Sequence, residues 1–178
     1  IPEGPTIQCD IVFGGAFYAV VCIDNMGFSL DPSQTDQLID RGKRIKAAIN
    51  DQFRIEHPSG DKDLSFLYGT IFVQNLSNGV HSRNVCIFAD GEVDRSPTGT
   101  GVSGRAALHY ARNEIQLEEK ITIESILGTT FQVSVEKEVR VGSIPGIIPR
   151  VTGKAHITGV HAFQIDPQDP LSKGFFLR

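Results

Sequence analysis

The residues best suited to chemistry in this sequence form a glycine-rich segment, Gly99-Thr100-Gly101-Val102-Ser103-Gly104. Its spacing matches the G-x-G-x-x-G pattern of dinucleotide-binding turns, and Glu118 and Glu119 follow about 20 residues later, where such a site has its ribose ligand. A dinucleotide turn leaves a buried strand directly, however, whereas here a polar loop from Asp90 to Pro97 intervenes. Dinucleotide binding is therefore disfavoured.

Two other interpretations of this segment stay open. The glycines can simply let a helix pack closely against a sheet, with Asp94 and Ser96 capping backbone amides, and this explains Gly104 well. It explains less well why three glycines and two threonines crowd the start of a helix. Free N–H groups and the helix dipole make that position a natural anion site, so the segment also predicts binding of a substrate anion.

Cysteine and histidine give little sign of a second site. The three cysteines, Cys9, Cys22 and Cys86, lie in apolar runs, where a free thiol is typically a small buried hydrophobic group. We expect them to be core residues of an intracellular, cytoplasmic protein, since an odd count without C-x-x-C pairs favours a reducing setting and no leader precedes them. The five histidines lack the spacing of a helical metal site, so no metal is expected.

Composition narrows the class of protein. The sequence has 178 residues, a net charge of −4, 40% hydrophobic and 21% charged residues, which is typical of a soluble globular domain. The longest early uncharged run, Ile11 to Ile23, has 13 residues and falls short of the ~20 that a membrane-spanning helix needs. Lys and Arg are scattered, so neither nucleic acid nor a membrane is an expected partner.

The elements that must position the glycine-rich segment follow from periodicity and turn residues. The expected helices are one that starts with Asp31 as N-cap and ends near Phe53, and one from the glycine-rich segment to about Asn113. The expected strands are Ile7–Phe13, Ala16–Asp24, Tyr68–Asn75, Asn84–Ala89, Lys120–Ile126, Phe131–Val141 and Lys154–Ile165. The expected turns and loops are Gly14-Gly15, Glu56–Asp63, Ser77-Asn78-Gly79, Gly128 and Gly142–Pro149. Gly14-Gly15 is expected to be a hairpin turn or a bulge in an antiparallel pair, and Ser77-Asn78-Gly79 to lie in the long turn of a second hairpin. Strands that cluster rather than alternate with helices predict an α+β fold with mostly antiparallel pairing.

A longer motif adds a family resemblance. Asp94-Arg95-Ser96-Pro97-Thr98-Gly99-Thr100-Gly101 resembles the second catalytic motif of the proline racemase family, Asp-Arg-Ser-Pro-Cys-Gly-Thr-Gly, with Thr98 in place of cysteine. Further matching segments cover nearly the whole chain: Phe13–Phe17, Glu124–Gly128, Gly153–Gly159, Asp166–Pro170 and Gly174-Phe175. The resemblance implies a diaminopimelate epimerase-like lobe whose strands wrap around a helix.

The resemblance also implies a division of the chain. Residues 1–160 would form the second of two similar lobes, and residues 161–178 a tail that returns to the first lobe, which is absent here. We expect the segment from Phe163 to Arg178 to pack partly on that lobe and to expose apolar surface without it. The first lobe is thus an expected partner, and a homodimer stays open.

Thr98 decides which reaction the resemblance implies. A racemase needs a base on each face of the substrate's α-carbon, and a threonine hydroxyl is too weak an acid to supply one. Within the family, threonine here marks the trans-3-hydroxy-L-proline dehydratases. The implied activity is therefore a cofactor-independent lyase reaction of amino-acid metabolism, in which α-proton abstraction and loss of the 3-hydroxyl give a cyclic imine, pyrroline-2-carboxylate.

The resemblance assigns roles to five residues. The backbone amides of Gly99 and Thr100 would hold the substrate carboxylate, and Asp94 would accept a hydrogen bond from the ring ammonium. Thr98 would either hydrogen-bond the departing hydroxyl or fill the space of the missing thiol. Phe88 would form an apolar wall or be an ordinary buried strand residue.

The base itself is not in this sequence. The family's first catalytic cysteine belongs to a Met-Cys-Gly-His type of motif, and no cysteine here is followed by Gly-His. We therefore expect the base on the first lobe and no turnover by this chain alone. Two alternatives remain: a proline or hydroxyproline epimerase or racemase with an altered second base, and a non-catalytic amino-acid-binding module.

Overall fold

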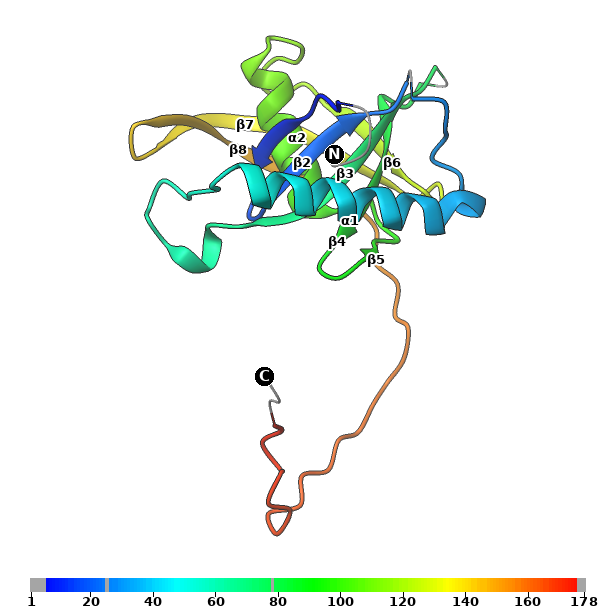
Figure 1. Ribbon diagram of the computed structural model, residues 1–178, viewed down its shortest axis with the longest axis vertical. Coiled ribbons are helices and arrows are strands. Elements are labelled where there is room, and N and C mark those ends of the chain that lie inside the picture. Colours follow the sequence, from blue (N-terminus) through cyan, green and yellow to red (C-terminus); the bar gives the residue numbers. More distant parts are fainter. Residues whose placement is uncertain (1–5, 25, 78, 176–178) are drawn as a thin grey trace.

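The structure is a computed structural model that describes residues 6–24, 26–77 and 79–175 (Figure 1). In these residues two α-helices, α1 (Thr35–Gln52) and α2 (Gly99–Ala111), accompany one sheet. Its strands are β1 (Asp10–Phe13), β2 (Phe17–Cys22), β3 (Leu67–Asn75), β4 (Ser82–Phe88), β5 (Glu92–Val93), β6 (Ile121–Ser125), β7 (Thr130–Val141) and β8 (Ile144–Thr152). They lie in the order β1-β2-β3-β4-β6-β7-β8, and β5 pairs with β4.

All strand pairings are antiparallel except β2–β3 and β4–β6. Parallel neighbours need a long crossover connection, and each helix lies in one: α1 between β2 and β3, and α2 between β4 and β6. The predicted α+β class with mostly antiparallel pairing is therefore confirmed. The predicted hairpin at Gly14-Gly15 is also confirmed, because β1 and β2 pair antiparallel across it and Gly15 has a φ of 112°.

The central strands are apolar on both faces, and alternate residues separate two cores. In β2, Ala19 and Val21 pack with α1, whereas Tyr18 and Val20 belong to the core on the α2 side. Successive side chains of a strand point to opposite faces, so each helix packs on its own side of the sheet. The α1 core contains Leu30, Leu38, Ile45, Ile49, Leu67, Phe72, Val85 and Ile87.

The sheet curls around α2. This helix contacts β1 and β2 at one end of the strand order and β7 and β8 at the other, while α1 covers β3 and β4 on the opposite face (Figure 1). Val102 and Ala106 of α2 are fully buried against β6 and β7. The wrapping of strands around a helix, expected from the family resemblance, is thus present.

Both predicted helices occur, with small differences at their boundaries. Asp31 caps a short 3₁₀ turn, Pro32–Gln34, by accepting a hydrogen bond from the Ser33 amide, and α1 follows directly and ends one residue before Phe53. The second helix starts at Gly99 and ends two residues before the predicted Asn113. The predicted β3–β4 hairpin is confirmed as well, although Asn78 of its turn lies outside the described residues.

The prediction for the last strand was wrong. Gly142–Pro149 was expected to be a turn region and Lys154–Ile165 a strand, but the strand is β8, and residues 154–165 have no regular structure. Pro145 and Pro149 fit in β8 because it lies at an edge of the sheet, where a missing N–H leaves no neighbour without a donor. Lys154–Ile165 has strand-like composition but pairs with no strand of the described chain.

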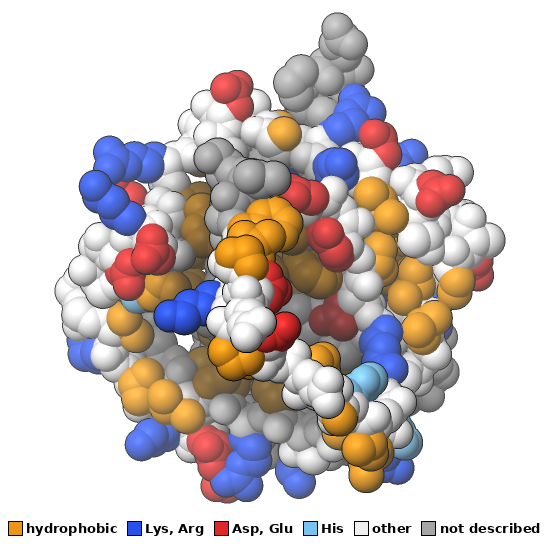
Figure 2. Space-filling view, turned by 90° about the horizontal axis from the view of Figure 1, so that it is seen from below, with side chains coloured by type: hydrophobic (Ala, Val, Ile, Leu, Met, Phe, Trp, Pro, Cys, Tyr) orange, Lys and Arg blue, Asp and Glu red, His pale blue; other side chains and the backbone are white. Residues whose placement is uncertain are grey.

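The described residues after Thr152 leave the body of the molecule and extend away from it (Figure 1). Figure 2 views this segment end-on, and hydrophobic side chains lie along it. Ile157 and Val160 are 94% and 95% exposed, and Phe163 and Ile165 are also exposed. The segment expected to act as a tail is therefore apolar and uncovered here; its residues 176–178, like residues 1–5 of the expected lobe, lie outside the described chain.

Candidate active site at the N-terminus of α2

The loop from Asp94 to Thr98 folds back on itself through its own side chains. The Ser96 amide donates to Asp94 Oδ1 at 2.9 Å, and the Thr98 amide donates to Ser96 Oγ at 3.0 Å. Thr98 Oγ1 in turn donates to Asp94 Oδ2 at 3.0 Å. Asp94 and Ser96 thus cap amides of the loop rather than amides of the helix. Both Asp94 oxygens are oriented, yet a carboxylate keeps lone pairs for a further donor.

Thr98 has a backbone conformation that side chains rarely adopt. Its φ of 68° and ψ of 105° lie in a region that favours glycine, and its side chain is only 6% exposed. A strained residue persists only where its surroundings hold it. The bonds to Asp94 and Ser96 do so on one side, and the first helical bond, from the Val102 amide to the Thr98 carbonyl, does so on the other.

The first amides of α2 point out of the helix without partners in the described chain. In the described part of the chain, the N–H groups of Gly99, Thr100 and Gly101 have no hydrogen-bond partner, as expected for the first turn of a helix. Thr98 makes no side-chain cap to them. With the positive end of the helix dipole, these amides can bind a carboxylate.

Packing explains two of the glycines but not the third. A Cβ on Gly101 would lie 2.6 Å from Ile71 Cδ1, and one on Gly104 would lie 2.7 Å from Val12 Cγ2. The close-packing explanation for Gly104 is thus confirmed. A Cβ on Gly99 would meet nothing within 4 Å, and Gly99 does not have a positive φ. Within this chain, nothing about packing or backbone requires glycine at position 99.

Tyr18 holds the helix end from the sheet, a role that sequence patterns did not indicate. It is 1% exposed in β2, and its hydroxyl lies 2.7 Å from Thr100 Oγ1. Burial raises the pKa of Tyr18 to about 12, so it stays a neutral phenol. A Cβ on Gly14 of the adjacent hairpin would lie 2.1 Å from the Thr100 carbonyl oxygen, so this turn also presses on the helix start.

The cysteines differ from the prediction that all three are core residues. Cys86 is buried, but Cys9 is half-buried and Cys22 is exposed at the end of β2. Cys86 lies against Thr98 and near Asp94, and burial raises the pKa of its thiol to about 12. Its thiol is therefore protonated at neutral pH and is unsuited to act as a base.

Phe88 lies on the same face of β4 as Cys86, two residues further on. It is half-buried, its ring centroid lies 5.6 Å from that of Tyr68, and Tyr68 in turn lies 5.9 Å from Tyr18. Phe88 is thus part of an aromatic group beside the helix start. Its partial exposure is compatible both with an apolar wall and with an ordinary strand residue.

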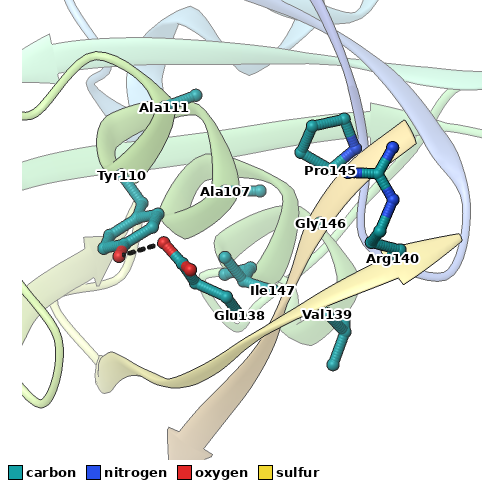
Figure 3. A pocket seen from close by; sticks show the side chains of 9 residues that line it. All are labelled: Ala107, Tyr110, Ala111, Glu138, Val139, Arg140, Pro145, Gly146 and Ile147. Carbon is teal, nitrogen blue, oxygen red and sulfur yellow. Dashed lines mark hydrogen bonds between the residues drawn. The ribbon is translucent and has the colours of Figure 1, made fainter. Parts of the chain in front are cut away.

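The hollows along α2 lie away from this loop. The pocket in Figure 3, about 490 Å³, is at the C-terminal end of α2, where Tyr110 donates to Glu138 Oε1 at 2.7 Å. A second pocket of about 570 Å³ is lined by the β1–β2 hairpin, the middle of α2 and β8. Asp94, Thr98 and Gly99 line neither of these two pockets and lie at the other end of the helix.

The described residues contain neither a metal-ligand cluster nor a membrane-spanning helix. No group of three or more His, Cys, Asp or Glu side chains is arranged to hold a metal ion there. Neither helix of this part of the chain is both long and apolar enough to cross a membrane.

Fold and site together define the class: a lobe of the diaminopimelate epimerase-like fold, with strands wrapped around a helix whose free N-terminus follows an Asp-Arg-Ser-Pro-Thr-Gly-Thr-Gly loop. The family model for proline racemase matches residues 1–176. The chain belongs to the proline racemase family.

Relatives within the family carry several names. The chain is 53% identical to trans-3-hydroxy-L-proline dehydratase of Colwellia psychrerythraea over 97% of its length and 48% of that protein. It is 41% identical to 3-hydroxyproline 2-epimerase of Burkholderia multivorans over 99% of its length and 53% of that protein. A hydroxyproline epimerase from Agrobacterium vitis, solved with bound trans-4-hydroxy-L-proline, superposes with a TM-score of 0.84 at 31% identity, over 96% of this chain and 49% of that one. The chain thus spans about half the length of the relatives it matches.

Proposed function

We propose that the whole protein is a lyase that dehydrates trans-3-hydroxy-L-proline, and that this chain supplies the half that anchors the substrate. The observation that carries the proposal is that a threonine, Thr98, precedes α2 and that its hydroxyl donates a hydrogen bond to Asp94. The similarity at 53% identity to a trans-3-hydroxy-L-proline dehydratase supports it. The reaction needs no cofactor in this scheme.

The substrate carboxylate would bind at the free amides of Gly99 and Thr100. The absence of a side chain at Gly99, which packing does not require, supports an approach of the ligand at that point. As the α-proton leaves, negative charge spreads onto the carboxylate, and the helix end stabilises it. Asp94 would accept a hydrogen bond from the ring ammonium with its remaining lone pairs.

The reaction would need a base on only one face of the substrate's α-carbon. A cysteine thiolate on the other lobe takes the α-proton, and the C–H electron pair forms the Cα–Cβ double bond while the C3–O bond breaks. The departing hydroxide takes up a proton and leaves as water. The resulting enamine tautomerises to the cyclic imine, pyrroline-2-carboxylate, so the net change is the loss of one water.

Thr98 would lie next to the leaving group. Because its own proton is donated to Asp94, its oxygen is free to accept a hydrogen bond from the substrate's 3-hydroxyl. Filling the space of a missing thiol is the alternative role. Phe88, beside the helix start, would contact the apolar side of the ring.

The names of several relatives make an epimerase the second candidate. It would need a base on this lobe. Thr98 is bonded to a carboxylate, which opposes formation of an alkoxide, and Cys86 beside it is a buried thiol with a raised pKa. Both observations favour elimination over inversion.

The exposed apolar segment after Thr152 supports a two-lobed protein. We propose that residues 1–160 form the second lobe and that residues 161–178 pack on the first, so that side chains such as Phe163 and Ile165 become buried. Packing these exposed apolar side chains against another lobe would remove them from water, which is favourable.

The test is an assay of the full-length protein beside this chain, with trans-3-hydroxy-L-proline and no added cofactor, that follows loss of one water by mass spectrometry. Turnover by the full-length protein alone is expected. Inversion at the α-carbon without loss of water would identify an epimerase. Binding of the substrate with neither reaction would identify the amino-acid-binding module instead.

A further inference from the structure

Asn84 connects the interior of the lobe with the loop that carries Thr98. It is fully buried in β4, on the same face as Cys86. Its Nδ2 donates to the Pro97 carbonyl oxygen at 3.2 Å, and its Oδ1 accepts from Arg105 Nη1 at 2.8 Å. Both ends of one amide are therefore used, one toward the loop and one toward α2.

Arg105 fixes which way the amide points. A guanidinium only donates, so it must face the carbonyl oxygen of Asn84, which leaves the NH₂ group for Pro97. Arg105 is 2% exposed, and burial lowers its pKa to about 10, so it stays charged at neutral pH. It also donates to Ser82 Oγ at 2.6 Å.

The positive charge of Arg105 is balanced by Glu114, to which it is connected through His109. Its Nη2 lies 2.9 Å from His109 Nε2, while His109 Nδ1 lies 2.5 Å from Glu114 Oε2. Because Arg105 can only donate, the neutral histidine must accept at Nε2 and donate from Nδ1 to Glu114. Arg105 therefore donates in two directions, to Asn84 and, through His109, toward Glu114.

Pro97 is the residue at which this network reaches the candidate site. Its carbonyl belongs to the same peptide unit as the Thr98 amide, and Thr98 holds a φ of 68°. The side chain of Cys86 also lies against Thr98 from β4, but Thr98 itself is hydrogen-bonded by its own loop and by α2, and Asn84 adds a bond from the sheet to the adjacent carbonyl. The hydrogen bond of Asn84 therefore fixes the strained peptide relative to the core.

From these contacts we infer that Asn84 is a positioning residue of the dehydratase reaction, which sets the Thr98 hydroxyl beside the leaving group through the Pro97 carbonyl. The inference rests on the proposed function. It adds a residue outside the motif, with a defined donor and a defined acceptor.

The variant that tests it in the full-length protein is Asn84→Asp. The carboxylate keeps the shape of the side chain and strengthens the contact with Arg105, so the fold should keep its thermal midpoint. It cannot donate to Pro97 and sets a negative oxygen against that carbonyl. We expect kcat for dehydration to fall by about tenfold or more, as for a lost hydrogen bond, with a smaller change in KM.

A second measurement separates positioning from general damage. Exchange of the α-proton with deuterated solvent reports the base on the other lobe, whereas dehydration also reports the leaving group. Asn84→Asp should keep exchange and lose elimination. A parallel loss of both reactions with a lowered thermal midpoint would make Asn84 merely structural, and unchanged elimination would overturn the inference.

Two matched variants serve as controls. Ser82→Ala removes another acceptor of Arg105 without touching Pro97, and Asn50→Asp makes the same chemical change on the exposed side of α1. Asn50→Asp should keep elimination within about twofold of the parent, and Ser82→Ala should lower elimination less than Asn84→Asp does. An effect of Ser82→Ala as large as that of Asn84→Asp would assign the effect to Arg105 and overturn the role of the Pro97 contact.

A readout without turnover keeps this inference distinct from the proposed function. In ¹⁵N-labelled full-length protein, Asn84→Asp should shift the amide resonance of Thr98, whereas Asn50→Asp should not. Parent protein without dehydratase activity would sink the proposed function, while an unshifted Thr98 resonance would sink the inference.

Discussion

The hydroxyl oxygens of Tyr18 and Thr100 lie 2.7 Å apart, so a buried residue of β2 is bonded to the second residue of α2. This contact joins the sheet to the helix turn whose amides face outward. Because the raised pKa of Tyr18 keeps the phenol neutral, the bond persists at neutral pH. The proposed carboxylate site is therefore anchored to the sheet by Tyr18, which is 1% exposed.

Tyr18→Phe in the full-length protein removes this bond and keeps the ring. We expect kcat/KM for trans-3-hydroxy-L-proline to fall by about threefold to tenfold, mainly through KM, because the amides that hold the carboxylate lose a support. Tyr110→Phe is the control, since Tyr110 donates to Glu138 at the other end of α2. Equal effects of both variants in steady-state kinetics would contradict the positional argument.

Gly99→Ala and Gly104→Ala should act in opposite ways. Alanine at position 99 meets open space and favours the helix, so the free energy of unfolding should stay the same or rise by up to about 1 kcal/mol. Alanine at 104 meets Val12 at 2.7 Å and should cost about 1–3 kcal/mol. Only Gly99→Ala should weaken substrate binding without loss of stability. Normal binding by Gly99→Ala, measured by calorimetry, would show that the ligand does not approach there.

Thr98→Cys restores the racemase motif. A thiol can supply the second base that threonine lacks, so the full-length variant should invert the α-carbon of proline or hydroxyproline measurably. Chiral chromatography after incubation in deuterated water detects both inversion and exchange. Thr98→Ser, which keeps the hydroxyl, is the control and should not invert. Inversion by Thr98→Cys no greater than in the parent would mean that other residues also gate the second face.

His81 should make the fold sensitive to acid. Its pKa is lowered to about 4, first by burial and then by the charge of Arg105 and by His109, whose ring centroid lies 4.8 Å away; the carboxylate of Glu114 acts in the opposite sense. The unfolded chain binds a proton near pH 6.5 and the folded chain only near pH 4. Stability is thus complete above pH 6.5 and falls as the pH drops toward 4, by on the order of 1–2 kcal/mol.

The measurement is denaturant unfolding of the full-length protein at pH 7 and pH 5. His81→Gln cannot take up the proton, so its stability should fall less between the two values than that of the parent. His156→Gln, an exposed change in the segment after β8, should leave the pH dependence as it is. The same pH dependence in the parent and in His81→Gln would refute the assignment.

Local sequence patterns predicted correctly those elements whose structure does not depend on their place in the sheet. The apolar, β-branched and aromatic composition of β2 and the capping residues around Asp31 are local signals, and both elements formed as expected. The last strand depended on position instead: Pro145 and Pro149 look like turn residues, but an edge strand tolerates them, and Lys154–Ile165 finds no strand to pair with. Pairing across the sheet is not a property of either segment alone.

The same limit applies to the site. The motif from Asp94 to Thr100 is contiguous, so its residues could be found together in the sequence. Tyr18 reaches it from a strand 82 residues earlier and Asn84 from β4, 13 residues before Pro97, and no local sequence pattern marks either residue. Cys22 was taken for a core residue because its run is apolar, yet it ends β2 and is exposed.

The closure of the sheet around α2 also bears on how the protein folds. The helix contacts strands from both ends of the described chain, β1 and β2 as well as β7 and β8. Such contacts raise the contact order, and closing long loops costs conformational entropy before any native contact is gained. We therefore expect the start of α2 to reach its final surroundings late, so that a folding intermediate would contain the proposed carboxylate-binding motif without its final geometry.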